Sequence, residues 1–317
     1  MKFPERVIVC EVSPRDGFQT APDVVSVENK LKLLDMIVDA GIKYIEVGTL
    51  KKDDPKAWKM HNTADVFKAL KRREGVEYRA LLQDPNGARE AVDCGCPRIK
   101  INISASVKHY RDMTGKTIEE GLKEFDEIGT IAANNGIPIT GSISLPFISP
   151  YDGVISIDFL KQIIKRYISI GADEISLSDA AGMANPRITY ERTMDLRAAF
   201  PEIKHWILHT HNTRGMALAN VVAGLSAGIS KLDGALAGIG GCPFFKKASG
   251  NISTEDLLFM LDSMGIETGV DFEKAMAAGR FVEELVNGSG IDSYQQRLDK
   301  IKREQGGIEA PEAVSPR

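Results

Sequence analysis

Three absences limit what this 317-residue chain can be. It has four cysteines (Cys10, Cys94, Cys96 and Cys242), too few and too scattered for a disulfide framework, so we expect reduced thiols. It has no run of about 18 apolar residues, which a membrane-spanning helix would require. It also has no long block of one charge, because 40 basic residues nearly balance 44 acidic ones. Nucleic acid and anionic membranes are therefore poor candidates for partners, and a small molecule is favoured.

The remaining composition is that of an ordinary globular protein, with 43% hydrophobic and 26% charged residues. The N-terminal stretch Met1–Val12 carries a short apolar run that ends in charge, which is not typical of a signal peptide. We therefore expect a cytoplasmic location. A single α/β barrel of about 250 residues with a C-terminal extension would account for the length of the chain.

Short β-rich runs alternate with helical patterns along the chain. The runs are Arg6–Val12, Lys43–Gly48, Tyr78–Gln83, Arg98–Ser104, Ile137–Leu145, Glu174–Asp179, His205–His211 and Lys231–Gly238. Eight strands separated by helices predict a parallel sheet closed into a TIM (β/α)₈ barrel. We expect the barrel at residues 1–250, additional C-terminal helices at 251–303 that complete the domain, and a flexible tail at 304–317.

Helix boundaries are signalled by capping residues. Ser26 precedes a helical pattern that Gly41 ends, and Asp158 is a possible cap of the helix before Gly171. Two helical segments follow the last strand, and the first opens with Ser253 and Asp256 as a plausible cap pair. The second segment, 271–290, has an apolar stripe that predicts a homodimer contact. The alternative is that the stripe packs on its own barrel.

Two histidines close the seventh predicted strand. Residues i and i+2 of a strand point to one face, so His209 and His211 both aim into the mouth of the barrel. Two converging imidazoles outline a metal site, although a pair of hydrogen-bonding core histidines is the alternative. Asp16 follows the first strand at the same rim and could supply an oxygen ligand. Arg15 beside it offers donors for a carboxylate or an enolate, although Arg15 and Asp16 alone would also suit a solvated turn.

The eighth strand runs into a loop with four glycines, at positions 238, 240, 241 and 250. Such a loop lets the backbone approach a ligand closely. Cys242 lies on it, near Lys246 and Lys247, and could serve as an acid or base, whereas Cys10, Cys94 and Cys96 read as small packing residues. Asn251, at the end of the loop, could give the metal another oxygen.

Two carboxylates end apolar strands at the same rim, Glu46 on the second and Asp179 on the sixth. An acid within an apolar strand needs a partner, which Arg15 or the metal could be, although either acid could be purely structural. The other histidines are less informative. His61 and His109 are expected at the surface, and His205 begins its strand at the opposite end of the barrel.

Taken together, "EVSPRDGFQ", "YIEVG", "EISLSDAAG", "HTHNTRGMALAN" and the "GIGGCPFFKKASGN" loop resemble the hydroxymethylglutaryl-CoA lyase family. The resemblance runs from residue 5 to about residue 300 in order. It implies a divalent cation, Mg²⁺ or Mn²⁺, held by Asp16, His209, His211 and Asn251. It further implies that Arg15 stabilises an enolate and that Cys242 acts in proton transfer.

The implied reaction is a retro-Claisen cleavage of a 3-hydroxy-3-methylglutaryl-CoA-like thioester to acetyl-CoA and a keto acid such as acetoacetate. The metal would lower the pKa of the substrate hydroxyl, Arg15 would stabilise the enolate, and Cys242 would protonate it. The base is left open between Asp179, a ligand histidine and another group. Glu46 is a further candidate for direct involvement.

Departures from the family leave the acyl substrate open. "TLKKDDPKAWKMHN" stands where the family usually reads like "SFVSPKWVPQM", and the loop "PFFKKASGN" is bulkier and more basic than usual. A sibling lyase for another branched 3-hydroxyacyl-CoA is therefore the first rival. A Claisen-type synthase is disfavoured because no regulatory domain follows the barrel, and a non-catalytic metal scaffold because it has no use for Cys242.

Overall fold

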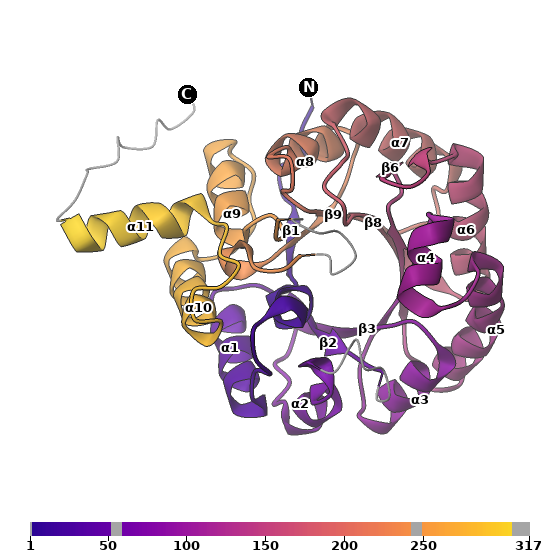
Figure 1. Cartoon of the computed structure of the whole chain (residues 1–317), viewed down its shortest axis with the longest axis horizontal. Coiled ribbons are helices and arrows are strands. Elements are labelled where there is room, and N and C mark those ends of the chain that lie inside the picture. Colours follow the sequence, from indigo (N-terminus) through magenta and orange to yellow (C-terminus); the bar gives the residue numbers. More distant parts are fainter. Residues whose placement is uncertain (1, 52–58, 242–248, 306–317) are drawn as a thin grey trace.

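The computed structural model describes residues 2–51, 59–241 and 249–305 of the chain, which form a closed barrel of parallel strands ringed by helices (Figure 1). The barrel strands are β1 Ile8–Glu11, β2 Tyr44–Thr49, β3 Glu77–Leu82, β4 Ile99–Ser104, β5 Ile139–Ser144, β8 Ala172–Asp179, β9 His205–Thr210 and β10 Lys231–Gly234. They follow one another around the barrel in this order, and β10 pairs with β1 to close it. Each strand overlaps one of the eight predicted runs, so the predicted TIM barrel is confirmed.

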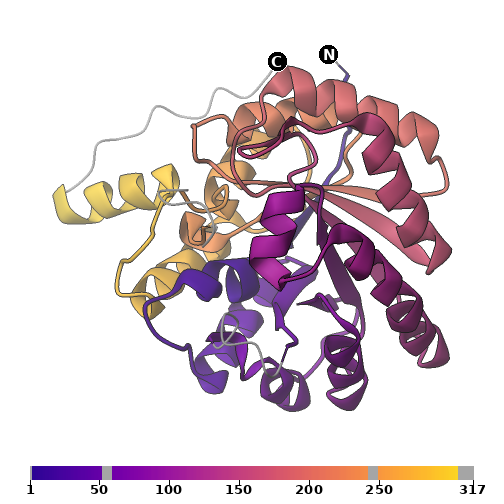
Figure 2. The same cartoon turned by 45° about the vertical axis from the view of Figure 1, so that its right-hand side comes forward.

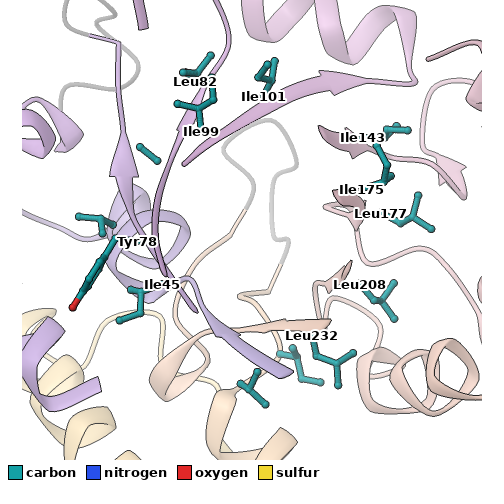
Figure 3. Packing of buried hydrophobic residues seen from close by; sticks show 14 of the residues in the cluster. Ile45, Tyr78, Leu82, Ile99, Ile101, Ile143, Ile175, Leu177, Leu208 and Leu232 are labelled. Atoms are coloured by element: carbon teal, nitrogen blue, oxygen red, sulfur yellow. The ribbon is translucent and has the colours of Figure 1, made fainter. Parts of the chain in front are cut away.

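The interior of the barrel is polar. Lys100 on β4 contacts Asp233 on β10 at 3.0 Å although these strands are not neighbours, so both side chains cross the interior. Successive residues of a strand face opposite sides, which turns Ile99, Ile101 and Leu232 outward, where they are buried in the hydrophobic core (Figure 3). The apolar core therefore lies between strands and helices, and the interior is left for charged residues rather than the usual branched aliphatic layers.

Helices cover the outside of the barrel. They are α1 Val27–Asp39, α2 Thr63–Ala69, α3 Pro85–Asp93, α4 Val107–Thr114, α5 Ile118–Asn134, α6 Ile157–Ser169, α7 Pro186–Ala199 and α8 Ala217–Ser226. Ser26 caps α1 as predicted, accepting a hydrogen bond from the Asn29 amide at 3.2 Å. Asp158 does not cap α6, because Ser156 holds the N-cap position and Asp158 lies in the first turn. A hairpin of two short strands, β6 Ile148–Ser149 and β7 Gly153–Val154, was not predicted.

Three helices follow the barrel rather than the two predicted: α9 Thr254–Ser263, α10 Phe272–Leu285 and α11 Tyr294–Gln305. Ser253 caps α9, but Asp256 does not complete a cap pair. Its carboxylate instead accepts hydrogen bonds from the amides of Tyr294 and Gln295 at 3.0 and 2.9 Å, which ties down the start of α11. Figure 1 and Figure 2 show α11 projecting from the barrel. The predicted tail lies, from residue 306 onward, outside the described residues.

The apolar stripe of α10 is covered within the chain. Its buried side includes Ala275, Met276 and Val282, and the helix contacts α1. The alternative reading of this stripe, packing on its own barrel, therefore accounts for it. No helix among the described residues is long and apolar enough to cross a membrane.

Glu11 joins the start of the barrel to its end. It is fully buried, and its Oε1 accepts hydrogen bonds from the amides of Ser13 at 2.8 Å and Leu236 at 3.0 Å. Its Oε2 accepts one from the Thr254 hydroxyl at 2.7 Å. Burial raises the pKa of Glu11 to about 7, against the opposing effect of these hydrogen bonds.

This pKa predicts a fall in stability with rising pH. A carboxyl group whose pKa is raised from 4.5 to about 7 binds more protons in the folded than in the unfolded state, so stability declines between these pH values. The full loss corresponds to about 3 kcal/mol. Glu11→Gln keeps the acceptor oxygen, and its amide can donate to Thr254. We expect this variant to gain up to about 3 kcal/mol on the wild type between pH 5 and pH 8, measured by urea unfolding. Glu28→Gln, at an exposed position on α1, is the control, and an equal difference at both pH values would contradict the prediction.

Candidate metal centre at the mouth of the barrel

Asp16, His209 and His211 converge at the carboxyl ends of β1 and β9. The two Nε2 atoms lie 3.1 Å apart, and Asp16 Oδ2 lies 3.5 Å from His211 Nε2 and 3.9 Å from His209 Nε2. All three residues are buried, and their potential ligand atoms lie within 4.8 Å of one another. Two imidazole nitrogens and a carboxylate oxygen that face one point are groups that could hold a divalent cation. The structure thus brings together the three residues that the two strand ends suggested.

A tight turn after β1 presents Asp16 to the histidines. In this π-helical turn, Ser13–Gly17, the carbonyl of Val12 accepts hydrogen bonds from the amides of Arg15 at 3.0 Å and Asp16 at 2.7 Å. The Arg15 guanidinium contacts Asp16 Oδ1. Burial raises the pKa of Asp16, but Arg15 and the two histidines outweigh burial and hold this pKa well below its usual range. Asp16 is therefore an anion, which is the form in which a carboxylate binds a cation.

Asn251 lies beside this cluster. It forms an antiparallel bridge with His211, and directly opposite residues of such a bridge place their side chains on one face. Its amide nitrogen donates to Asp16 Oδ2 at 2.8 Å and to the carbonyl of Ile239 at 3.1 Å. Its Oδ1 is buried with no hydrogen-bond partner among the described residues. The glycine at 240 is required here, because a Cβ at this position would collide with the Asn251 amide.

A cavity of about 140 Å³ opens next to the three residues. Arg15 and Glu46 line it near the ends of β1 and β2, and a further wall comes from β3, the residue after β3, β4 and α4. Residues of that wall are Leu81, Gln83, Lys100, Asn102, His109 and Met113. A polar organic molecule can therefore lie between α4 and the three residues Asp16, His209 and His211.

Glu46 lies inside the barrel, next to Arg15. Its Oε1 is 3.5 Å from Arg15 Nε, and the side chain is 1% exposed. Burial raises the pKa of Glu46, but Lys100, Arg79 and Arg15 outweigh burial and lower it. Glu46 therefore holds Arg15 at the edge of the cavity as a charged partner, which is the contact that the sequence suggested.

Asp179 does not line the cavity. Its carboxylate accepts hydrogen bonds from the amides of Met183 at 3.1 Å and Ala184 at 3.0 Å, and burial raises its pKa. Ser178, one residue earlier on β8, does line the cavity, so alternation along the strand directs Asp179 to the other side. In this structure Asp179 shapes the loop after β8, and the main-chain carbonyl of Asp179 accepts a hydrogen bond from the His211 amide at 3.3 Å.

The structure describes three of the four cysteines. Cys242 lies outside the described residues, as do Lys246 and Lys247. Cys10, Cys94 and Cys96 are buried and free, in agreement with their prediction as reduced packing residues. Burial raises the pKa of Cys10 and Cys96 to about 12, so neither is a thiolate at neutral pH.

His109 was expected at the surface, and this prediction was wrong. It is 2% exposed, lines the cavity and places Nδ1 2.9 Å from the Ser104 hydroxyl. Burial lowers its pKa to about 4, so the imidazole is neutral. The sequence did offer a signal for this position. His109 lies early in the helix that follows β4, and the segments after the barrel strands form the rim that holds the site. The two other predictions hold, since His61 is exposed and His205 begins β9.

Most charged residues inside the barrel were missed, among them the pair of Glu174 and Lys231. Arg79 on β3, Lys100 on β4 and Asp233 on β10 are all buried, and with Glu46 they form a cluster beneath the metal site. Asp233 Oδ2 lies 3.3 Å from His209 Nδ1. The available signal was a single charge at one position of an apolar strand, the same signal that singled out Glu46.

Comparisons with known proteins agree with this site. The model of the HMGL-like family matches residues 6–282. The chain is 37% identical over 286 residues to the cytoplasmic 3-hydroxy-3-methylglutaryl-CoA lyase of Danio rerio, covering 90% of this chain and 85% of that protein. It is 36% identical over 301 residues to the mitochondrial hydroxymethylglutaryl-CoA lyase of Homo sapiens, covering 94% and 91%.

Solved structures give the same result. The HMG-CoA lyase of Bacillus subtilis superimposes with a TM-score of 0.89 at 32% identity, covering 95% of this chain and 100% of that one. The enzyme of Acinetobacter baumannii, in complex with coenzyme A and 3-methylmalate, gives 0.88 at 31% identity, covering 98% and 100%. Because these matches run over nearly the whole chain, the chain belongs to the hydroxymethylglutaryl-CoA lyase family of enzymes.

Proposed function

We propose that this enzyme cleaves 3-hydroxy-3-methylglutaryl-CoA to acetyl-CoA and acetoacetate with the help of a divalent cation. The observation that carries the proposal is the convergence of Asp16, His209 and His211 beside the guanidinium of Arg15 at the mouth of the barrel. The names of the related lyases and the coenzyme A complex of the Acinetobacter baumannii enzyme support the thioester substrate.

The residues present fit a metal ion. Two imidazole nitrogens face each other at 3.1 Å, an arrangement that needs a cation or a proton between them. The buried Oδ1 of Asn251 has no hydrogen-bond partner in the described part of the chain, which makes it a candidate fourth ligand atom. A mixed oxygen and imidazole set suits Mg²⁺ or Mn²⁺. When bound, the ion would polarise the oxygens of the substrate and lower the pKa of its hydroxyl.

The side chains around the ion divide the remaining chemistry. Arg15, held by Glu46, places a cationic donor where negative charge develops on the thioester carbonyl as the carbon–carbon bond breaks. Cys242 protonates the resulting enolate carbon, which completes acetyl-CoA. For Asp179 the geometry favours a structural role in the loop after β8, so we place the base that takes the hydroxyl proton elsewhere.

The direct test measures acetoacetate and acetyl-CoA formed from hydroxymethylglutaryl-CoA with Mg²⁺ or Mn²⁺. We expect turnover that EDTA abolishes, and a loss of about 10²- to 10⁴-fold in Cys242→Ala, the range for removal of a general acid. Cys94→Ala is the matched control, because Cys94 occupies the C-cap position of α3, its thiol faces the carbonyl of Ala91 at 3.6 Å, and it does not line the cavity. If the wild type binds Mn²⁺ but does not cleave hydroxymethylglutaryl-CoA, this proposal is wrong and the second candidate function is favoured.

The second candidate is a sibling lyase for another branched 3-hydroxyacyl-CoA. It is supported by Gln83, Asn102 and His109, which line the cavity with amide and imidazole groups that suit a polar acyl substituent. A panel of 3-hydroxyacyl-CoA thioesters with larger or polar substituents, compared by kcat/KM, distinguishes the two candidates.

We also propose a homodimer and a cytoplasmic location. Since the α10 stripe is covered within the chain, support for the dimer comes from α11, where Tyr294 and Leu298 are 58% and 50% exposed. Support for the location comes from the cytoplasmic name of the Danio rerio relative, whereas the human relative is named mitochondrial. Sedimentation analysis and cell fractionation test these two proposals.

A further inference from the structure

Four buried charges from four strands form a closed cluster inside the barrel. Glu46, Arg79, Lys100 and Asp233 are each at most 4% exposed. Arg79 reaches Glu46 at 3.0 Å and Asp233 at 2.9 Å, and Lys100 reaches the same two carboxylates at 3.0 Å each. With two cations and two anions, the cluster is neutral, so each buried charge is compensated by two neighbours of opposite sign.

This quartet touches the catalytic machinery on two sides. Through Asp233 it reaches His209, with 3.3 Å between Asp233 Oδ2 and His209 Nδ1. Through Glu46 it reaches Arg15, with 3.5 Å between Glu46 Oε1 and Arg15 Nε. The remaining contacts of the quartet with charged side chains lie within the quartet itself, among the described residues.

Asp233 lies on the Nδ1 side of His209 at an ion-pair distance, and Nδ1 has no hydrogen-bond partner among the described residues. A carboxylate next to Nδ1 favours the tautomer with the proton on Nδ1, which leaves a lone pair on Nε2. Nε2 is the atom that lies near Asp16 and His211. Arg79 and Lys100 hold Asp233 from two sides, so this carboxylate can neither turn away from His209 nor follow it.

We propose that Asp233, fixed by Arg79 and Lys100, is a positioning residue that orients His209 for the metal. None of these three residues binds the metal, and they act through His209. Loss of an outer-shell partner of a metal-bound histidine typically weakens metal binding by about 10- to 100-fold. The inference rests on the proposed function only in taking His209 as a metal ligand.

The test measures metal binding directly rather than activity. We expect Asp233→Asn to weaken Mn²⁺ binding, measured by electron paramagnetic resonance of free Mn²⁺, by about 10- to 100-fold. The chain has five histidines, so ¹⁵N spectra of the imidazole rings can follow His209 separately. We expect one tautomer of His209 in the wild type and a mixture in the variant.

A matched control distinguishes the loss of a positioning contact from the loss of a buried charge. Glu174, 2% exposed, pairs with Lys231 at 2.6 Å inside the same barrel and contacts neither His209 nor Arg15. Glu174→Gln therefore removes an equally buried charge and should leave the Mn²⁺ affinity unchanged. Equal weakening in Glu174→Gln, or unchanged affinity in Asp233→Asn, would overturn the proposal.

A second variant covers the case in which Asp233→Asn does not fold. The double variant Asp233→Asn with Lys100→Met keeps the cluster neutral, because Glu46 and Arg79 remain as one pair. It should fold and still bind Mn²⁺ weakly, whereas wild-type affinity in it would overturn the proposal. A wild type that binds Mn²⁺ without cleaving hydroxymethylglutaryl-CoA would contradict the proposed function alone. A wild type that binds no Mn²⁺ would contradict both.

Discussion

Asp16→Asn should abolish metal binding and with it the lyase reaction. The substitution removes the only negative charge among the three convergent ligand groups. It also places an amide donor against donors that already face both oxygens, since Gln19 donates to Oδ1 and Asn251 to Oδ2, each at 2.8 Å. Loss of an outer-shell partner of a metal-bound histidine weakens metal binding by up to about 100-fold. Asp16 is itself a proposed ligand, so we expect Asp16→Asn to lower the Mn²⁺ affinity by more than this. Calorimetric titration with Mn²⁺ and the product assay measure the two effects.

Asp84→Asn is the control for this experiment. Asp84 also follows a barrel strand at the same rim, but its carboxylate caps α3 by accepting from the Gly87 amide at 2.9 Å. Asparagine is an equally good cap, so this variant should keep both stability and metal affinity. Metal binding in Asp16→Asn at the wild-type level would show that the ligand set is wrong.

Arg15→Met should lower kcat by about 10²- to 10³-fold, the typical cost of removing one donor to a developing oxyanion. Arg15 contacts Asp16 and lies 3.5 Å from Glu46, so its guanidinium is held at the edge of the cavity before substrate arrives. Because a cation next to the metal site is removed, Mn²⁺ should bind at least as tightly as in the wild type. Single-turnover rates at saturating metal measure the effect on the chemical step.

Arg15→Lys distinguishes charge from shape. A lysine keeps the positive charge but not the planar fork that reaches several acceptors at once, so we expect partial recovery of kcat. Weaker metal binding in Arg15→Met, with kcat restored by excess metal, would mean that Arg15 supports the ligands rather than the enolate.

Local sequence was sufficient to predict the barrel and the convergence of Asp16, His209 and His211. Alternation of apolar runs with capped helices predicts a parallel barrel, and in a parallel barrel every strand end meets at one rim. Asp16, His209 and His211 could therefore be placed together although about 190 residues separate the aspartate from the histidines. The same rule brought Asn251 and Glu46 to the site, as the structure shows.

The rule failed where the direction of a side chain mattered. Asp179 lies at the correct rim, but it turns away from the cavity because Ser178 occupies the inward position of β8. His109 turns in, although its neighbours on α4 gave it the appearance of a surface residue. Such directions depend on the phase of each strand and helix, which a strand end alone does not determine.

By itself the sequence determined the barrel, the rim at which the site lies and the residue types that meet there, because these follow from periodicity and from the order of the elements. Only the tertiary structure decided which charges share the barrel interior. Asp233 on β10 is distant in sequence from Arg79 on β3 and Lys100 on β4, and their pairing depends on the stagger of the closed sheet. Stagger is a property of the whole ring of strands, so the cluster beneath the metal site appears only when the ring is closed.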